Sequence, residues 1–259
     1  MTPQLLTTED QYLWQELESS LGNTAYKTQI ARLVTASSYA LKQLSRTPEL
    51  LTGLQTLSEF KLDDFPDLQN SQQTLDLVAF KQVLRQYRHR KLVDIIFLDT
   101  VKHAPLPLVL QYLSDLADLL ITKTLEACEQ HIAAKHKQPG DADGNPMHLN
   151  IIAMGKLGGR ELNFSSDIDL ICCYASDGDL DGFGHLSYQE FFTRVVRAFS
   201  KCLAENTADG FVYRVDLRLR PWGDSGPVVL SHAALEHYYQ LHGREWEQYA
   251  MVKARILTG

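Results

Sequence analysis

The distribution of glycine divides this chain more sharply than any other sequence feature. Of the 15 glycines, only Gly22 and Gly53 lie before residue 140, and the other 13 lie at or beyond it. Glycine destabilises helices and supplies the turns between shorter elements. The pattern therefore predicts a helical domain over residues 1–137, a linker over residues 138–147 and a mixed domain over residues 148–259.

Hydrophobic spacing supports an α+β fold class. Apolar residues recur at helical spacing over residues 74–103 and 106–136. In the second half, short apolar runs predict strands over residues 148–154, 168–174 and 212–219, and helical spacing predicts helices over residues 187–206, 231–239 and 245–256. We therefore expect an N-terminal helical domain followed by a domain with a small mixed β-sheet flanked by helices.

A basic run lies inside the helix predicted over residues 74–103. It contains Arg85, Arg88, His89, Arg90 and Lys91. Such a run is most often a solvated helix face with acidic neighbours. The alternative is a docking surface for an acidic partner or for the other domain. The sequence favours the first interpretation and leaves the second open.

The charge balance and the cysteines restrict the class of protein. There are 32 acidic residues against 25 lysines and arginines, a formal net charge of −7, whereas proteins held on nucleic acid by overall charge are basic. The cysteines form no CxxC pair, which is typical of a reducing compartment. There is no signal-like N-terminus and no apolar run near the ~18 residues of a spanning helix. We expect a soluble, cytoplasmic protein with no nucleic-acid or membrane partner.

Two aspartates in the segment GKLGGRELNFSSDIDL are candidate metal ligands. Asp167 and Asp169 are two positions apart, so on a strand their side chains point to one face, while Ile168 and Leu170 point to the other. Neighbouring carboxylates repel each other unless a cation compensates their charge. A hard divalent cation with oxygen ligands fits this need, and Mg²⁺ is the usual one beside phosphates.

The residues before these aspartates favour a phosphate-binding turn. Gly155, Gly158 and Gly159 would let the backbone approach a ligand closely, and the hydroxyls of Ser165 and Ser166 would donate to phosphate oxygens. The segment contains neither the GxxxxGK[ST] pattern of a P-loop nor the GxGxxG dinucleotide fingerprint.

A second segment, YRVDLRLRPWGDSG, adds a third carboxylate. Alternation along a strand places Asp216, Arg218 and Arg220 on one face, opposite the apolar residues of the segment. A lone pair of aspartates is a weak signal, because acidic side chains on an edge strand are common; a third carboxylate beside two arginines strengthens it. The arginines would bind phosphate through their forked guanidinium groups, or would pair with acidic residues structurally. The sequence leaves these two roles open.

These features together carry a resemblance. A glycine turn followed by SDxD on a strand, with a third aspartate on a later strand, resembles the DNA polymerase β-like nucleotidyltransferase superfamily. The longer segments GKLGGRELNFSSDIDLI, GFVYRVDLRLRPWGDSGPVVLS and GREWEQYAMVKARILTG resemble the family of bifunctional glutamine synthetase adenylyltransferase/adenylyl-removing enzymes. The resemblance is strong over residues 148–259 and weaker over the helical half.

The resemblance implies a nucleotidyltransferase involved in nitrogen metabolism. Members of the family carry two catalytic copies: the first removes AMP from a tyrosine of glutamine synthetase by phosphorolysis, releasing ADP, and the second attaches AMP from ATP. The segment RLRPWGDSGPVVLS resembles the first copy, so the resemblance implies the adenylyl-removing half. The implied partners are glutamine synthetase, ATP or ADP, phosphate and, in the full-length enzyme, a PII signal protein.

The resemblance also implies roles for individual residues. The implied catalytic and Mg²⁺-binding residues are Asp167, Asp169 and Asp216. The implied nucleotide- and phosphate-binding residues are Gly155, Lys156, Gly158, Gly159, Ser165, Ser166, Arg218 and Arg220. Lys253 and Arg255 lie in matching segments without a clear role.

Two other functions and one expectation about length remain. The chain could be a nucleotidyltransferase with another acceptor, or a catalytically silent docking or regulatory module for glutamine synthetase or a PII protein. The chain is much shorter than members of the family, so we expect a fragment truncated on its C-terminal side. In that case Val252 and Ile256 would be partly exposed.

Overall fold

The computed structural model describes residues 7–22, 24–66, 76–141, 143–180 and 186–258. The chain forms two compact units, one comprising Met1–Phe65 and Gln86–Leu116 and the other Pro66–Arg85 and Ala117–Gly259. Two long helices, α5 (Leu77–Thr100) and α6 (Leu106–Ala133), contribute to both units. The second unit thus includes the first turns of α5 and most of α6 in addition to the glycine-rich half of the chain.

The first unit is a helical cluster. Its helices are α1 (Thr8–Ser20), α2 (Thr24–Ala36), α3 (Ser38–Arg46), α4 (Leu50–Thr56) and the later turns of α5. They enclose a core that includes Trp14, Ile30, Leu33, Leu41, Leu44, Leu54 and Phe97. The hydroxyls of Thr7 and Ser37 accept hydrogen bonds from the first turns of α1 and α3, which fixes where these helices begin.

The basic run on α5 is not a solvated face, contrary to the interpretation that the sequence favours. Arg85 is fully buried and donates to the carbonyls of Lys81 (2.9 Å), Gly210 (2.8 Å) and Glu205. Lys91 is also buried, and its ammonium contacts Asp63 at 2.7 Å. Arg85 and Lys91 are therefore buried cations with partners of their own. The spacing of charges along a helix does not show which of them are buried.

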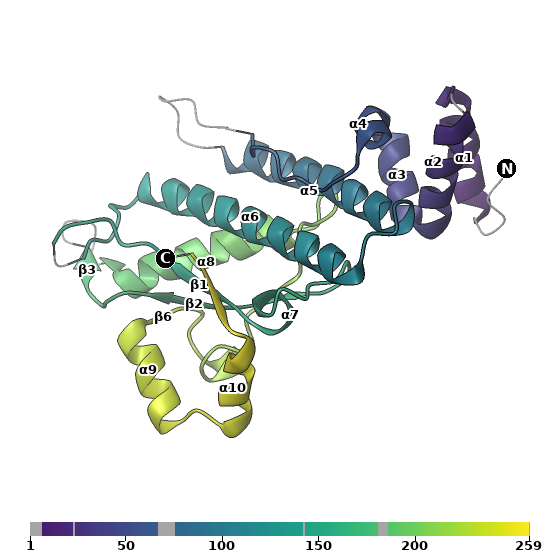
Figure 1. The fold of residues 1–259 in the computed structure, drawn as a ribbon. Helices are drawn as coiled ribbons and strands as arrows, with labels where there is room; N and C mark the ends of the chain where they lie inside the picture. The colour runs from purple at the N-terminus through teal and green to yellow at the C-terminus, as the bar shows by residue number, and fades with distance from the viewer. Residues whose placement is uncertain (1–6, 23, 67–75, 142, 181–185, 259) are drawn as a thin grey trace. The chain divides into compact units, whose positions relative to one another are not determined.

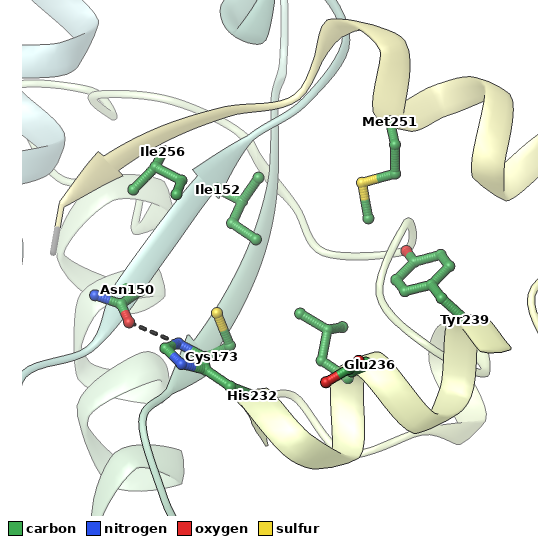
Figure 2. Close-up of a pocket in the computed structure, with 9 residues that line it drawn as sticks. Asn150, Ile152, Cys173, His232, Glu236, Tyr239, Met251 and Ile256 are labelled. Carbon is green, nitrogen blue, oxygen red and sulfur yellow. Dashed lines mark hydrogen bonds between the residues drawn. The ribbon is translucent and has the colours of Figure 1, made fainter.

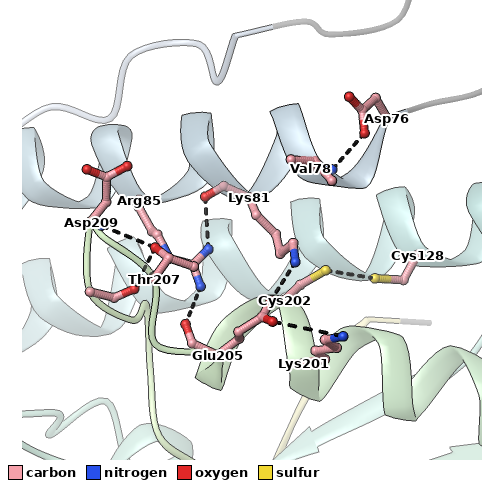
Figure 3. Close-up of polar contacts among 11 residues, drawn as sticks. Asp76, Val78, Lys81, Arg85, Cys128, Lys201, Cys202, Glu205, Thr207 and Asp209 are labelled. Atoms are coloured by element: carbon pink, nitrogen blue, oxygen red, sulfur yellow. Dashed lines mark hydrogen bonds and ion pairs between the residues drawn. The ribbon is translucent and has the colours of Figure 1, made fainter.

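In the second unit, side-chain contacts connect α5, α6 and α8 (Tyr188–Ala204) (Figure 3). Lys81 forms an ion pair with Glu205, which follows α8 directly. The thiol of Cys128 on α6 lies 3.8 Å from Cys202 Sγ on α8, and both are buried. A capping box at Ser187 and Glu190 begins α8.

A small mixed sheet forms the centre of the second unit. Its strands are β1 (Asn150–Ala153), β2 (Ile168–Tyr174), β5 (Val215–Asp216), β6 (Leu230–Ser231) and β7 (Arg255–Thr258). The order is β5-β2-β1-β7, and β6 also pairs with β2. The strands β1, β2 and β7 are antiparallel neighbours, whereas β5 and β6 run parallel to β2. This arrangement confirms the α+β class.

Helices cover both faces of the sheet (Figure 1). Within this unit α6 and α8 lie on one side of β1 and β2, and α9 (His232–Leu241) and α10 (Glu245–Ala250) lie on the other. The remaining elements are a short hairpin, β3 (Asp179–Leu180) with β4 (Leu186–Ser187), the helical turn α7 (Gly155–Gly158), and 3₁₀ turns at Gly223–Ser225 and Met251–Lys253.

Two predicted elements differ in the structure. The strand predicted over residues 212–219 is reduced to Val215–Asp216, because the chain turns after Asp216 and Arg220 N donates to Leu217 O. The helix predicted over residues 245–256 ends at Ala250, and β7 follows a 3₁₀ turn. β7 finds its backbone partners on β1, far away in the sequence, and such pairing overrides local spacing.

The C-terminal segment exposes apolar side chains, as the sequence predicts for two of them. Val252 is 75% exposed and Ile256 70%, and Trp246 and Tyr249 are also exposed. We call these four the C-terminal apolar residues. In the part of the chain that the structure describes, none of the helices combines the length and the apolar character needed to cross a membrane.

Candidate active site

The first residues of β2 and the strand β5 bring the predicted carboxylates together. Asp167 directly precedes β2, Asp169 is its second residue, and Asp216 is the last residue of β5. The parallel pairing of the two strands sets Asp169 beside Asp216. On the other face of β2, Ile168 and Leu170 are fully buried. The sheet therefore presents acidic groups on one side while its apolar residues fill the core on the other.

This arrangement shifts the pKa of Asp169, the central carboxylate. Burial raises the pKa of Asp169, and the negative charges of Asp216 and Asp167 raise it further. By contrast, the hydrogen bonds from Arg218 hold the pKa of Asp216 below its ordinary value. The site thus contains one carboxyl that resists ionisation beside one that is held ionised.

Two arginines pair with the outer carboxylates. Arg218 Nε lies 2.9 and 3.0 Å from the two oxygens of Asp216, and its backbone N–H donates to the same carboxylate at 2.8 Å. Arg214 donates from Nε to Asp167 and from Nη2 to the carbonyl of Ser165 at 2.8 Å. The sequence analysis did not single out Arg214. The alternation that groups Asp216 with Arg218 extends back to Arg214, so the signal was present.

The glycine turn α7 packs directly against the acidic residues. Gly155 has a φ of +53°, and a Cβ at this position would lie 2.9 Å from Asp169 Oδ2. Both facts require glycine. A Cβ at Gly158 would lie 1.8 Å from the carbonyl oxygen of Lys253, and one at Gly159 would lie 3.3 Å from the Lys253 side chain. These glycines therefore let the chain approach itself closely, which explains their presence without a ligand.

The loop between α7 and β2 places the predicted polar side chains near the turn. Lys156 Nζ donates to Ser166 Oγ at 3.3 Å, and that hydroxyl donates to Asn163 Oδ1 at 2.6 Å. The carbonyl of Ser165 accepts a hydrogen bond from Arg214, which also pairs with Asp167. Lys156 is close enough to Asp169 for its positive charge to favour ionisation of that carboxyl.

Arg220 acts on this group of side chains through its charge, which helps the hydrogen bonds from Arg218 to lower the pKa of Asp216, while its own hydrogen bonds lie in the following loop. It is buried, and it donates to the carbonyls of Leu217 (2.8 Å) and Gly226 (3.4 Å), while Asp224 lies 3.7 Å away. Because the strand ends at Asp216, Arg220 does not continue the alternation. Its visible contacts stabilise the loop over residues 217–226.

A cavity of about 580 Å³ lies between the sheet and α9 (Figure 2). Its lining includes Ile152, Cys173, Tyr239 and Met251, and a 2.8 Å hydrogen bond joins His232 to the Asn150 side chain at its edge. Cys173 shares the face of β2 that carries Asp169, about 13 Å along the strand. None of the predicted site residues lines this cavity. The sequence pattern does not predict this cavity, because the residues that line it come from segments far apart in the chain.

The donor set of the acidic group fits Mg²⁺ in its chemistry. Asp167, Asp169 and Asp216 offer only oxygen ligands. Burial and then the charges of Asp216 and Asp167 raise the pKa of Asp169, and a cation would relieve the repulsion among the three carboxylates. Among the described residues, no group of three or more His, Cys, Asp or Glu side chains is already arranged to hold a metal. The ion pairs of Asp167 with Arg214 and of Asp216 with Arg218 account for this arrangement of the side chains.

Known proteins are similar to this chain over most of its length. Residues 27–259 match the family model described as glutamate-ammonia ligase adenylyltransferase. The curated relatives include proteins named bifunctional glutamine synthetase adenylyltransferase/adenylyl-removing enzyme. The one from Mannheimia haemolytica is 45% identical over 91% of this chain and 25% of its own length. The one from Thioalkalivibrio sulfidiphilus is 47% identical over 71% and 19%, and the one from Shewanella frigidimarina 40% over 95% and 26%.

The chain thus spans about a quarter of the length of two of these relatives and less of the third. The model match covers the glycine turn, both aspartate segments and most of the helical half. On this evidence, the chain belongs to the glutamate-ammonia ligase adenylyltransferase family.

Proposed function

We propose that residues 148–259 form a nucleotidyltransferase domain that removes AMP from adenylylated tyrosine of glutamine synthetase by phosphorolysis. The observation that carries this proposal is the convergence of Asp167, Asp169 and Asp216 beside the glycine turn. Relatives of the chain are named for adding and removing adenylyl groups on glutamine synthetase. The segment RLRPWGDSGPVVLS, which resembles the first catalytic copy, favours removal.

The reaction exchanges one phosphorus–oxygen bond for another. An oxygen of inorganic phosphate attacks the α-phosphorus of the adenylyl group, the bond to the tyrosine oxygen breaks, and ADP is released. The phenolate takes up a proton, and because free tyrosine has a pKa near ~10 it is a poor leaving group at neutral pH. The site must therefore stabilise negative charge on both the phosphate oxygens and the departing phenolate.

The residues of the site divide this work. Asp167, Asp169 and Asp216 would hold Mg²⁺, which when bound neutralises charge on phosphate oxygens and on the leaving group. Lys156, Ser165 and Ser166 border the same side of the turn and would orient the phosphate oxygens. Arg214 and Arg218 hold the outer carboxylates in position, and a phosphate anion would compete for their guanidinium groups.

The direct test supplies adenylylated glutamine synthetase, phosphate and Mg²⁺ to the purified chain and measures ADP. We expect ADP to form with the wild type and to be lost in Asp169→Asn and Asp216→Asn. The matched control is Asp179→Asn, an exposed aspartate on β3, which should retain wild-type activity.

A parallel reaction separates the other functions. Unmodified glutamine synthetase with ATP would release pyrophosphate if the chain adds AMP instead. If glutamine synthetase binds while neither product forms, the chain is a docking module, a function favoured by the C-terminal apolar residues. A nucleotidyltransferase with another acceptor would bind nucleotide with Mg²⁺ and leave both forms of glutamine synthetase unchanged.

A further inference from the structure

Arg255, the first residue of β7, contacts the end of the glycine turn, whose first residue, Gly155, lies against Asp169. Its Nη2 donates to the carbonyl of Leu157 at 3.0 Å, and its Nε donates to the carbonyl of Gly158 at 3.3 Å. The same guanidinium makes a two-pronged ion pair with Asp118 on α6, at 2.8 and 3.0 Å. One side chain thus joins β7, α7 and α6.

The turn α7 needs such a partner. It consists of Gly155–Gly158, and a helix of this length has little stability of its own. The last carbonyls of a helix have no partner within it and are satisfied from outside, often by a basic side chain. Arg255 fulfils this role for the carbonyl of Gly158, and it is a second donor to the carbonyl of Leu157, which also accepts the N–H of Arg160. The glycine content of the turn increases its conformational freedom and so increases the need for an external constraint.

The main chain next to Arg255 constrains the same turn. At Gly158 a Cβ would lie 1.8 Å from the Lys253 carbonyl, so the backbones of α7 and residue 253 are in contact. The register of β7 on β1 sets Arg255 opposite Ala153, just before the turn begins. On its other side the turn abuts Asp169 at Gly155. Contacts of α7 with residues 253 and 255 therefore help to set its distance from Asp169.

We propose that Arg255 is a positioning residue that, with Asp118, holds the α7 turn against the acidic residues of β2. The consequence for catalysis rests on the proposed function, but the effect on the turn does not. Asp118 neutralises the guanidinium and fixes its plane, so that Nε and Nη2 face the carbonyls of the turn. A lysine at this position keeps the charge and loses the fork, so it could not hold α6 and both carbonyls at once.

Hydrogen–deuterium exchange of the full chain tests the effect on the turn directly. The N–H groups of Gly159, Arg160 and Glu161 donate to carbonyls within the turn, and that of Gly158 donates to the carbonyl of Met154 just before it. The exchange of these four amides therefore reports the opening of the turn. We expect Arg255→Lys to raise their exchange rates at least about tenfold, while amides in α1–α4 stay unchanged. Asp118→Asn should raise them by a smaller factor, because the bonds from Arg255 to the carbonyls remain.

Arg160→Lys is the matched control. Arg160 Nη2 lies 3.7 Å from the same Asp118 carboxylate, and its side chain is more exposed. Its exchange pattern should equal that of the wild type. If Arg255→Lys folds and protects the turn as well as the wild type does, the proposal is wrong. If it fails to fold, Asp118→Asn decides by the same criterion.

The assay of adenylyl removal supplies the second measurement. Misplacing the turn should lower kcat by about tenfold or more and leave KM for adenylylated glutamine synthetase unchanged, since it misaligns the reacting groups without removing a contact to the protein substrate. A wild type that forms no ADP would refute the proposed function and leave the exchange result to decide this inference. A wild type that is active, with Arg255→Lys equally active and equally protected, would refute only this inference.

Discussion

Asp169 lies between two other carboxylates, and burial and these neighbours raise its pKa above the ordinary value. A carboxyl whose pKa is raised by folding binds its proton more tightly in the native state than in the unfolded chain. Stability therefore falls as the pH rises through its titration. At neutral pH the ionised carboxylate of Asp169 therefore lowers the free energy of unfolding.

Asp169→Asn should raise the free energy of unfolding at pH 7 by about 0.5–1 kcal/mol, because it removes like-charge repulsion across adjacent strands. Millimolar Mg²⁺ should raise the Tm of the wild type and leave that of the variant unchanged. Thermal unfolding with and without Mg²⁺ measures both effects. Equal Mg²⁺ responses in the two proteins would remove Asp169 from the set of metal ligands.

Asp94 on α5 offers a pH-dependent effect outside the site. Burial is the main cause that raises its pKa to about 6, against the attraction of Lys91 at 3.7 Å. Between about pH 4 and 6 the native state binds more protons than the unfolded chain, so stability falls as the pH rises through this window. Asp94→Asn should gain about 1–2 kcal/mol at pH 7 and nearly nothing below pH 4.

Urea unfolding between pH 4 and 8 measures this difference. The matched control is Asp64→Asn, which makes the same substitution at an exposed aspartate of the same unit. A flat profile for Asp94→Asn would show that Asp94 is solvated in solution.

At the scale of elements, two glycines differ in the space that the fold leaves for a side chain at their position. A Cβ at Gly158 would collide with the Lys253 carbonyl at 1.8 Å and the Ala153 carbonyl at 2.6 Å, whereas a Cβ at Gly53 in α4 would meet nothing within 4 Å. Gly158→Ala should therefore destabilise the second unit by at least about 3 kcal/mol. Gly53→Ala should stabilise the first unit by about 0.5–1 kcal/mol. Chemical denaturation of both variants compares the two; a tolerated Gly158→Ala would mean that α7 and the 3₁₀ turn at Met251–Lys253 are not in contact.

The elements also show how far the sequence determines this fold. The strand predicted over residues 168–174 is confirmed as β2, and the helices predicted over residues 74–103 and 106–136 appear as α5 and α6, each ending a few residues earlier than predicted. The first two residues of the helix predicted from residue 74 lie outside the described residues. These elements carry a long, regular apolar pattern. β5 and β7 were misjudged in length or type, because their extent depends on partners that are distant in the sequence.

The candidate site was predictable to a similar degree. The alternation on two segments brought Asp167, Asp169 and Asp216 to attention, and the structure sets them near one another. What spacing could not give was the pairing of Arg214 with Asp167 or the turn that removes Arg220 from the strand. The first depends on the pairing of β5 with β2, and the second on how the chain bends after Asp216. A two-residue period encodes neither.

For the molecule as a whole, the C-terminal apolar residues favour association. Tyr249 and Val252 are 79% and 75% exposed, and exposed apolar groups promote contact between molecules. The double variant Tyr249→Lys and Val252→Lys should therefore lower the apparent mass at high protein concentration while keeping the Tm within about 1–2 °C of the wild type. Light scattering over a concentration series measures this, with Val78→Lys, an exposed apolar position on α5, as the control. Unchanged association would place the contact elsewhere.

The topology of the sheet also sets an order of assembly. Asp169 and Asp216 are separated in the sequence by α8 and the strands β3 and β4, and β1 and β7 by about a hundred residues, so both strand pairs need distant segments to meet. Helical contacts are local and form quickly, whereas distant strand pairs must first close long loops. During synthesis or refolding the chain should therefore gain most of its helices early. A chain halted before β7 docks would be rich in helix, yet its glycine turn would lack the backbone against which it rests.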